Sequence, residues 1–265
     1  MLGMEYRISV LMGVYNCAAT LPEALDSLFV QTYSNFKVIV CDDGSEDDTY
    51  AVAKLYADMH DNVVLIRNEK NMGLNYTLNH CLEYADTEYC ARMDGDDVSL
   101  PTRFETEIDF LDGHPEFAFV SCPMIYFDHD GDFKIGKAIN EPVAKDFVIG
   151  SPFCHAPCMI RTEAYKAVGG YTVDKRLLRV EDDHLWFKLY AAGFKGYNIE
   201  DPLYKMRDDR AAFSRRNWQS RKNEMYVRRM GIKMLHLPWY YQFFSLRPLL
   251  AYLAPKWIYN LYHYK

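Results

Sequence analysis

The sequence lacks several features that would place the protein in a particular class. Its first seven residues do not join a basic segment to an apolar one, so we expect no cleaved signal and a cytoplasmic location. Its seven cysteines are odd in number and include no Cys-x-x-Cys pair, which favours free thiols. Cys154, His155 and Cys158 lie close together, but no second Cys or His pair accompanies them. A structural zinc site needs four ligands, so we do not expect one.

Positive charge is scarce over most of the chain. Residues 1–210 contain 20 Lys and Arg against 36 Asp and Glu, whereas residues 211–265 contain 10 against 1. The two parts therefore carry net charges of −16 and +9, which together give the −7 of the whole chain. An acidic body binds nucleic acid poorly and holds an anionic substrate only through a metal ion or local backbone donors. We expect no nucleic-acid partner, and a different partner for each part.

The first hundred residues alternate as in a parallel α/β protein. Short apolar runs at 8–14, 36–41, 63–67 and 88–93 predict strands, and helical patterns separate them. Thr20-Leu21-Pro22-Glu23 has the pattern of a capping box with proline in the first turn, so a helix should begin there. A chain of 265 residues can bury one substantial core. We expect residues 1–210 to form an α/β domain with a mostly parallel sheet, and residues 211–265 to form a helical extension.

Polar loops follow each of these predicted strands. Open parallel sheets bind ligands beyond the carboxyl ends of their strands, where these loops should meet. The loops contain Tyr15-Asn16, Asp42-Asp43-Gly44-Ser45, residues 68–73 and Asp94-Gly95-Asp96-Asp97. In the last loop three carboxylates end an apolar run, and they would repel one another without a cation. Such oxygen ligands favour Mg²⁺ or Mn²⁺, so we predict a site for a metal ion and a diphosphate.

Two later segments have recognisable local patterns. Residues 124–127 and 133–135 flank an Asp-Gly turn, which predicts a β-hairpin. The acidic turn between them also has part of a calcium-loop pattern, but Phe133 stands where that pattern demands glycine, so we favour the turn. A helix should begin near Glu181 and end at Gly193, a residue suited to a helix C-terminus.

Six motifs, in this order, resemble the family 2 glycosyltransferases. They are Met12-Gly13-Val14-Tyr15-Asn16, Cys41-Asp42-Asp43-Gly44-Ser45, Asp94-Gly95-Asp96-Asp97, His155, Gly169-Gly170-Tyr171 and Glu181-Asp182-Asp183-His184-Leu185-Trp186. Each is weak alone, but their order and spacing over about residues 7–216 are strong. The resemblance implies a GT-A fold, which is Rossmann-like, and inverting transfer from a nucleotide sugar, most of all a UDP-sugar, with Mn²⁺ or Mg²⁺. Gly13 and His184 depart from the residues that many members carry.

The resemblance implies roles for the first two loops. Asp42 would accept a hydrogen bond from the ring N–H of uracil, which suits a carboxylate because it is only an acceptor. Tyr15 and Asn16 would lie beside the nucleotide. The alternative for Asp42 is an Asx turn with Gly44 supplying the backbone freedom, and the alternative for Tyr15 is a place in the core.

The last of the four loops matches the Asp-x-Asp motif of the family. Asp94 and Asp96 would bind the divalent ion that bridges the diphosphate, and Asp94 would also contact the nucleotide. Asp97 would support them or shape the turn. The alternative is a solvated acidic turn, which we favour less because the cluster ends a predicted buried strand.

Asp182 is the predicted general base of an inverting transfer. It would take the proton of the acceptor hydroxyl while the sugar carbon is attacked from the face opposite the diphosphate. Its place at a helix start should keep it ionised. Glu181 would orient the pair or the loop, and the alternative is that residues 181–183 are ordinary carboxylates at a helix start. His155 and the turn at residues 169–171 match positions on the acceptor side, and the alternative for His155 is a structural role. Arg207 would return positive charge to the diphosphate, unless it pairs with the Asp208-Asp209 sequence, where members carry a histidine ligand.

The extension is basic first and then aromatic. Seven Lys and Arg lie between residues 215 and 233, and Trp239-Tyr240-Tyr241 is followed by tyrosines at 259, 262 and 264. Such a composition is typical of a membrane interface, while the prolines and charges at 238, 247, 248, 255 and 256 interrupt any spanning run. Each Lys or Arg near an anionic bilayer contributes roughly 1 kcal/mol. We predict peripheral binding to the cytosolic face of the membrane; the alternatives are packing on the acidic body and a subunit contact.

These features predict a metal-dependent, inverting glycosyltransferase that extends a lipid-linked glycan during surface polysaccharide biosynthesis. The rival enzyme is a nucleotidyltransferase acting on sugar phosphates. It would need a basic, glycine-rich loop after the first strand, and residues 14–20 contain no basic residue. The rival outside enzymes is a non-catalytic module that binds sugar or metal. The sequence indicates no oligomeric state.

Overall fold

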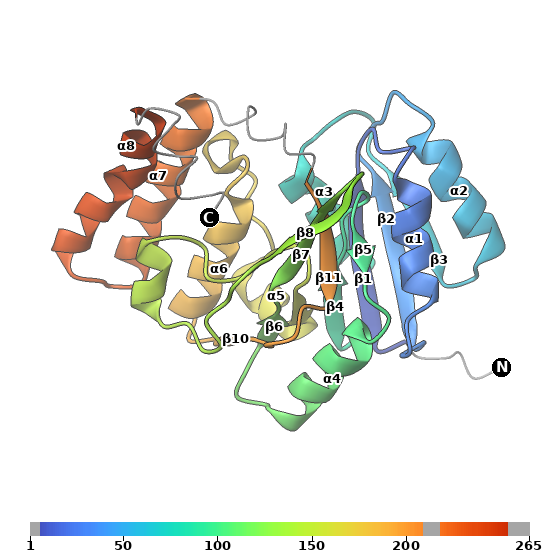
Figure 1. Cartoon of the computed structure of the whole chain (residues 1–265), viewed down its shortest axis with the longest axis horizontal. Coiled ribbons are helices and arrows are strands. Elements are labelled where there is room, and N and C mark those ends of the chain that lie inside the picture. The colour runs from blue at the N-terminus through green and yellow to red at the C-terminus, as the bar shows by residue number, and fades with distance from the viewer. Residues whose placement is uncertain (1–5, 209–217, 254–265) are drawn as a thin grey trace.

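A seven-stranded sheet forms the centre of the protein (Figure 1). The computed structural model describes residues 6–208 and 218–253. The strand order is β10, β6, β9, β4, β1, β2, β3, and neighbours run parallel except β9, which is antiparallel to both β4 and β6. The strands are β1 (Ile8–Val14), β2 (Phe36–Asp42), β3 (Val63–Arg67), β4 (Tyr89–Arg92), β6 (Phe119–Ser121), β9 (Met159–Arg161) and β10 (Gly196–Asn198). The prediction of a mostly parallel sheet is confirmed.

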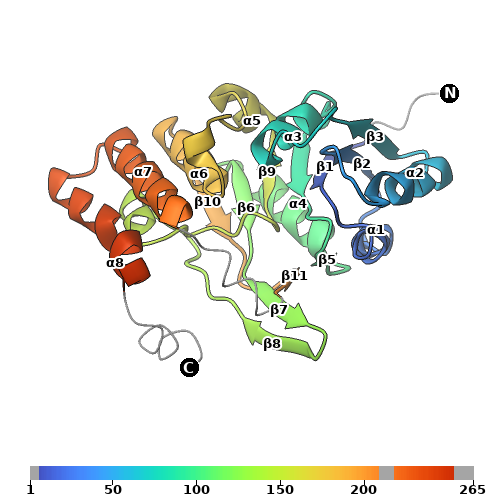
Figure 2. The same ribbon diagram turned by 90° about the horizontal axis from the view of Figure 1, so that it is seen from above.

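Helices cover both faces of this sheet because its central strands are apolar on both sides. Val10 and Met12 of β1 pack in one core with α1 (Leu21–Phe29), α2 (Thr49–Met59) and α4 (Arg103–Gly113). Leu11 packs in the other core with α3 (Leu74–Leu82), α5 (Thr162–Val168) and α6 (Glu181–Ala191). Figure 2 shows this layering from above.

A second, four-stranded sheet lies beside the carboxyl end of β4. Its order is β5 (Val98–Ser99), β11 (Tyr204–Arg207), β7 (Met124–Asp128), β8 (Gly131–Ile135). The antiparallel pair β7–β8 is the predicted hairpin, and Gly131 adopts a φ of +111° in its turn. Because β5 follows the acidic loop directly, the small sheet and this loop are held together.

The local predictions succeed at strands and fail at one helix cap. The four predicted strands agree with β1 to β4 to within one residue at each end. Thr20 stands at the N-cap of α1 as predicted, but its side chain makes no capping hydrogen bond. Its hydroxyl instead donates to the carbonyl oxygens of Gly95, at 2.9 Å, and Cys17, at 3.2 Å. The prediction of a capping box is wrong, because the Thr20 hydroxyl binds the acidic loop to the start of α1 and does not cap the helix.

The C-terminal extension packs on the α/β body. Helix α7 (Trp218–Met234) contacts α6, η1 (Ala144–Val148) and η2 (Lys175–Leu177), and it is followed by η4 (Trp239–Leu246) and α8 (Arg247–Leu253). A Cβ added at Gly231 would lie 2.3 Å from the ring of Phe187 on α6, so only glycine permits this approach. Some of the basic and aromatic residues on which the membrane prediction rests, those at 215, 216, 259, 262 and 264, lie outside the described residues. Within the part that the structure describes, no helix is both long and apolar enough to cross a membrane.

Candidate active site

The polar loops after β1 and β2 are joined to each other at the carboxyl edge of the sheet. Asn16, which has a φ of +48°, donates its backbone N–H to Ser45 Oγ at 3.0 Å. Its Oδ1 accepts from the backbone N–H of Glu46 at 2.9 Å. Gly44 has a φ of +71°, and a Cβ there would lie 2.6 Å from the backbone of Lys70. Asn16 and Gly44 therefore shape the edge where a ligand would bind.

The two carboxylates of the β2 loop have different environments. Asp42 is fully buried; its Oδ1 accepts from Ser45 N at 3.1 Å, and its Oδ2 lies 2.8 Å from Arg67 Nε. Asp43 accepts from Asn68 Nδ2 and from two backbone N–H groups in the loop after β3. Both carboxylates thus hold loops in place.

A pocket of about 230 Å³ opens between these loops and α3. It is lined by Gly13, Val14, Tyr15, Asp43, Asn71, Gly73, Leu74 and Thr77. Tyr15 is 43% exposed, so it is not a core residue. The pocket contains Asp43 but not Asp42, and the geometry therefore favours Asp43 for contact with a ligand bound here.

The acidic loop after β4 is held from three sides. The backbone N–H of Asp94 donates to Tyr204 Oη at 3.1 Å, and the backbone N–H of Arg207 donates to Asp97 Oδ1 at 2.8 Å. A Cβ at Gly95 would lie 2.8 Å from Cys17 Sγ, so glycine lets the loop pass close to the segment between β1 and α1. The result is a rigid loop whose carboxylates are crowded together.

This crowding raises the pKa values of two carboxyl groups. Burial, followed by the charges of Asp94 and Asp96, raises the pKa of Asp97 to about 8. Asp96 is exposed to solvent, although the protein around it and the charge of Asp94 raise its pKa. A divalent cation would relieve this repulsion, and the oxygen ligands suit Mg²⁺ or Mn²⁺. The residues present therefore fit the predicted metal.

Arg92 is a site residue to which sequence reasoning assigned no role. Its side chain is 3% exposed, and its Nη1 and Nη2 donate to the two oxygens of Asp94 at 2.7 and 2.6 Å. Arg103 Nη2 donates to the carbonyl oxygen of Arg92 at 2.9 Å and fixes its backbone. The sequence did contain a sign of this role: Arg92 lies within a predicted buried strand, and a buried cation needs a partner of opposite charge.

The charge of Arg92 also reaches the first turn of α6. It lowers the pKa values of Glu181 and Asp182, but burial outweighs it and raises both, that of Glu181 to about 7. We expected the helix dipole to keep Asp182 ionised; burial has the larger effect on its pKa, because this carboxylate is half-buried in the first turn of α6. The guanidinium of Arg92 thus binds the donor-side carboxylate Asp94, and its charge also acts on the predicted base.

His155 lies within the same buried region. Its Nε2 is 2.7 Å from Tyr171 Oη, and burial, followed by the charge of Arg92, lowers its pKa well below the usual range. The backbone of Tyr171 is held by Asn79, whose side chain bonds both its N–H and its carbonyl oxygen. Gly170 has a φ of +62° and lies against Asn79. His155 is therefore a neutral, positioned ring at this site.

Arg207 lies at the donor side. It forms an ion pair with Glu23, and its Nε donates to the carbonyl oxygen of Asp96 at 2.9 Å. Its guanidinium carbon is 4.5 Å from the centroid of the Phe127 ring. These contacts place a positive charge beside Asp96, where the acidic loop after β4 meets β11. Asp209, one of the two aspartates offered as an alternative partner of Arg207, lies outside the described residues.

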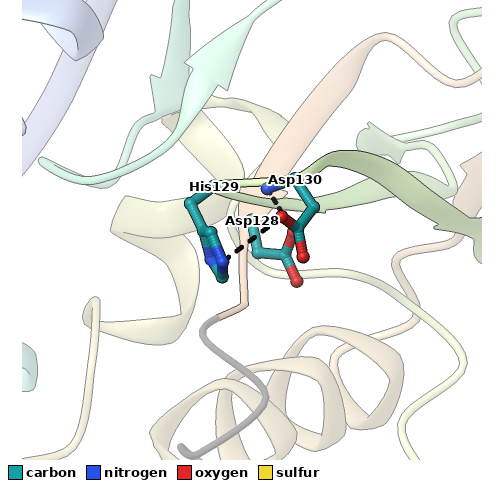
Figure 3. A group of neighbouring side chains, drawn as sticks. All are labelled: Asp128, His129 and Asp130. Carbon is teal, nitrogen blue, oxygen red and sulfur yellow. Dashed lines mark hydrogen bonds and ion pairs between the residues drawn. The ribbon is translucent and has the colours of Figure 1, made fainter.

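A different acidic group lies at the tip of the hairpin (Figure 3). Asp128, His129 and Asp130 bring one ligand atom each to within 4.8 Å of one another. Asp130 N donates to Asp128 Oδ1 at 2.9 Å, and His129 Nε2 lies 3.3 Å from Asp130 Oδ1. The side chain of His129 is 87% exposed. These contacts are those of a turn, as the hairpin prediction requires, and the group lies apart from the sheet edge.

Comparison with known proteins agrees with this arrangement. The sequence profile described as "Glycosyl transferase family 2" matches residues 9–169. A putative glycosyltransferase of Bacillus subtilis, EpsE, is 39% identical over 264 residues, which cover 98% of this chain and 94% of that protein. The amylovoran biosynthesis glycosyltransferase AmsE of Erwinia amylovora is 30% identical, with 85% and 86% covered. An Escherichia coli relative, 26% identical with 86% and 88% covered, is a UDP-Glc:alpha-D-GlcNAc-diphosphoundecaprenol beta-1,3-glucosyltransferase, WfaP.

Solved structures agree on the fold. TarS of S. aureus in complex with UDP aligns with a TM-score of 0.67 at 19% identity, covering 86% of this chain and 69% of that one. The mannosyltransferase PcManGT of Pyrobaculum calidifontis, in complex with GDP-Man and Mn²⁺, aligns with a TM-score of 0.66 at 20% identity, covering 93% and 75%. The chain is therefore a glycosyltransferase of the GT-A fold, and it belongs to glycosyl transferase family 2.

Proposed function

We propose that the protein transfers a sugar, with inversion, from a UDP-sugar to a lipid-linked glycan during surface polysaccharide biosynthesis. The observation that carries this proposal is the convergence of two acidic elements on Arg92. Asp94 accepts both of its hydrogen bonds, and Asp182 lies within the reach of its charge. A transferase must bring its donor and acceptor groups together, because the reacting atoms approach to about 3–3.5 Å.

The base and ribose of the donor are assigned to the pocket beside Tyr15. Asp43 lines this pocket and is an acceptor only, so it would read a ring N–H such as that of uracil. The exposed ring of Tyr15 would lie beside the base. Support for UDP comes from the TarS complex and from the donor named for the Escherichia coli relative. The GDP-mannose complex of PcManGT provides the alternative donor to test.

The diphosphate is assigned to the acidic loop. Asp96 and Asp94 would hold a Mg²⁺ or Mn²⁺ ion, which would neutralise charge on the leaving diphosphate. Arg207, beside Asp96, would add a fixed positive charge there. Asp97 would hold the loop through its hydrogen bond from the backbone of Arg207.

Asp182 would act as the general base. It would take the proton of the acceptor hydroxyl, whose oxygen forms a bond to the anomeric carbon as the bond from that carbon to the diphosphate breaks. Burial raises the pKa of this carboxyl group, which strengthens it as a base. Glu181 and His155 would position the acceptor beside it.

The acceptor class follows from the relatives. The Escherichia coli protein acts on a GlcNAc carried on diphosphoundecaprenol, and AmsE is named for the biosynthesis of amylovoran. We assign the same class here, a sugar on a lipid diphosphate, which would place the protein at the cytosolic face of a membrane.

Purified protein should be tested first by thermal shift with UDP-sugars and GDP-sugars, each with and without Mn²⁺. We expect a UDP-sugar to stabilise the protein only when the metal is present. Asp43→Asn should weaken this stabilisation more than Asp42→Asn. A shift with GDP-sugars alone would refute the donor assignment.

Turnover should be tested with the same donor and a lipid-linked glycan. UDP release should depend on the acceptor and should be lost in Asp182→Asn and Asp96→Ala. Release of diphosphate from a nucleoside triphosphate and a sugar phosphate would instead indicate a nucleotidyltransferase. Donor binding without any turnover would indicate a binding module.

A further inference from the structure

The end of the described chain carries a surface of exposed aromatic side chains. Trp239 is 74% exposed, Tyr240 49%, Phe243 64% and Phe244 45%. The ring centroid of Trp239 lies 6.5 Å from that of Tyr240 and 5.9 Å from that of Phe243, and the half-buried ring of Tyr241 joins Tyr240, at 4.8 Å, to Phe244, at 6.0 Å. We call these four exposed residues of η4 the aromatic face. Leu250 of the adjoining α8 is 65% exposed. Single exposed apolar residues are ordinary, but a contiguous group marks a site of interaction.

The charge around the aromatic face is of one sign. From residue 225 to the C-terminus the sequence contains six Lys and Arg and no Asp or Glu. Arg229, Lys233 and Arg247 are exposed, and none of them forms an ion pair with another residue in the described parts of the chain. Arg229 donates instead to Ser245 Oγ at 3.1 Å and Arg247 to the carbonyl oxygen of Ile149 at 3.4 Å. The partner of this surface should therefore offer negative charge.

The aromatic face is attached firmly to the body through α7. Asn223 Nδ2 donates to the carbonyl oxygen of Leu178 at 3.1 Å, and Arg228 Nη1 donates to that of Ile149 at 2.5 Å. The charge of Arg228 also acts on Asp183, which follows the proposed base directly in α6. The basic residues of α7 are thus partly used within the molecule, and the surface that remains available is that of η4 and α8. In Figure 1 these elements lie at the opposite end of the molecule from α2.

We propose that the aromatic face and the basic residues beside it dock the protein on an anionic lipid bilayer. Trp and Tyr prefer the bilayer interface, where their rings are buried and their polar groups stay hydrated, and the lipid headgroups supply the negative charge. Docking through η4 would hold α6, which carries the proposed base Asp182, on the side of the protein that faces the membrane and its lipid-linked acceptor. This last point rests on the proposed function; the binding itself does not.

Flotation with vesicles of phosphatidylcholine, with and without phosphatidylglycerol, tests the proposal without any turnover. We expect the full-length protein to float with the anionic vesicles and to be released by salt. Trp239→Ser with Phe243→Ser should lower the partition coefficient at least tenfold. Leu55→Ser with Met59→Ser is the matched control, because these α2 residues are 61% and 64% exposed. This control should bind as the wild type does.

Charge is tested separately. Lys233→Glu should lower binding by about fivefold or more, since one Lys or Arg near an anionic surface contributes about 1 kcal/mol. Lys195→Glu, an exposed position on the body, should change binding little. Circular dichroism and thermal melting of every variant would establish that it is folded.

Three results would overturn the proposal. One is the absence of flotation at low salt by the full-length protein. Another is equal loss of binding in the Leu55 and Met59 control. The third is self-association of the wild type, seen as a concentration-dependent shift in sedimentation velocity, that the Trp239 and Phe243 variant loses although it still binds vesicles. The aromatic face would then contact the acidic body of a second copy. Failure of the transfer assay alone would leave all three measurements unaffected.

Discussion

Replacing Arg92 by lysine tests the central contact of the site. Lysine keeps the positive charge but offers a point donor in place of the planar fork of arginine. In the wild type both oxygens of Asp94 accept hydrogen bonds from this fork, at 2.7 and 2.6 Å. The variant should therefore hold Asp94 by one bond at most and allow the carboxylate to rotate.

The magnitude follows from the burial of the two partners. A hydrogen bond to a charged group contributes roughly 1.5–3 kcal/mol. The side chain of Arg92 is 3% exposed, but that of Asp94 is 30% exposed, so water can replace part of the lost bond. We expect the free energy of unfolding to fall by about 2 kcal/mol, which corresponds to roughly 5 °C in Tm. Misplacement of a reacting group by about 1 Å can cost roughly 100-fold, so kcat/KM should fall by about that factor.

The assay compares thermal melting with initial rates of UDP release. Arg161→Lys is the matched control, since Arg161 donates to Phe117 O, Leu111 O and Tyr89 Oη but lies at the amino edge of the sheet. It should lower Tm by a similar amount and leave KM for the donor unchanged. Equal losses of kcat/KM in the two variants, or wild-type kcat/KM in Arg92→Lys, would refute the reasoning.

Three further predictions concern pH and packing. Asp97 has a pKa of about 8 in the folded protein, far above the value near 3.9 of an unfolded chain, so its ionisation opposes folding and stability should fall as pH rises from about 4 to about 8. Asp97→Asn should flatten this dependence and stabilise the protein by at most about 5 kcal/mol at pH 8, as measured by urea unfolding. Because Asp182 must be ionised to act as a base, kcat/KM, measured from initial rates of UDP release, should rise with pH up to its raised pKa; a profile that is flat across acid pH would contradict this role. Gly231→Ala should lower the free energy of unfolding by about 1–3 kcal/mol, because its Cβ would meet Phe187; an unchanged Tm would contradict the packing of α7 on α6.

The elements of the fold could be predicted because they depend on local patterns. The strands of the parallel sheet are short apolar runs between helical segments, and their bounds follow from where polarity returns. Since parallel strands end at one edge, their order along the chain also predicts that the loops carrying Tyr15, Asp42 and Asp94 would gather there. The motifs then indicated the family, which the comparisons confirm.

The side-chain partners could not be predicted, because each of them joins segments far apart in the sequence. Thr20 has the residue type of a helix cap, yet its hydroxyl donates to the loop at Gly95. Asp42 and Asp43 are adjacent carboxylates of the same type, and only the packing of the loop after β3 decides that Asp43 lines the pocket.

By itself, then, the sequence determined the first four strands, the β7–β8 hairpin, the family, and which loops carry the polar groups, because periodicity and motif spacing are local properties. The tertiary structure alone decided which groups meet. It paired the guanidinium of Arg92 with Asp94, brought its charge within reach of the first turn of α6, and half-buried Asp182 so that its pKa is raised. The approach of Arg92 to Asp182 joins segments 90 residues apart, and no local pattern encodes that approach.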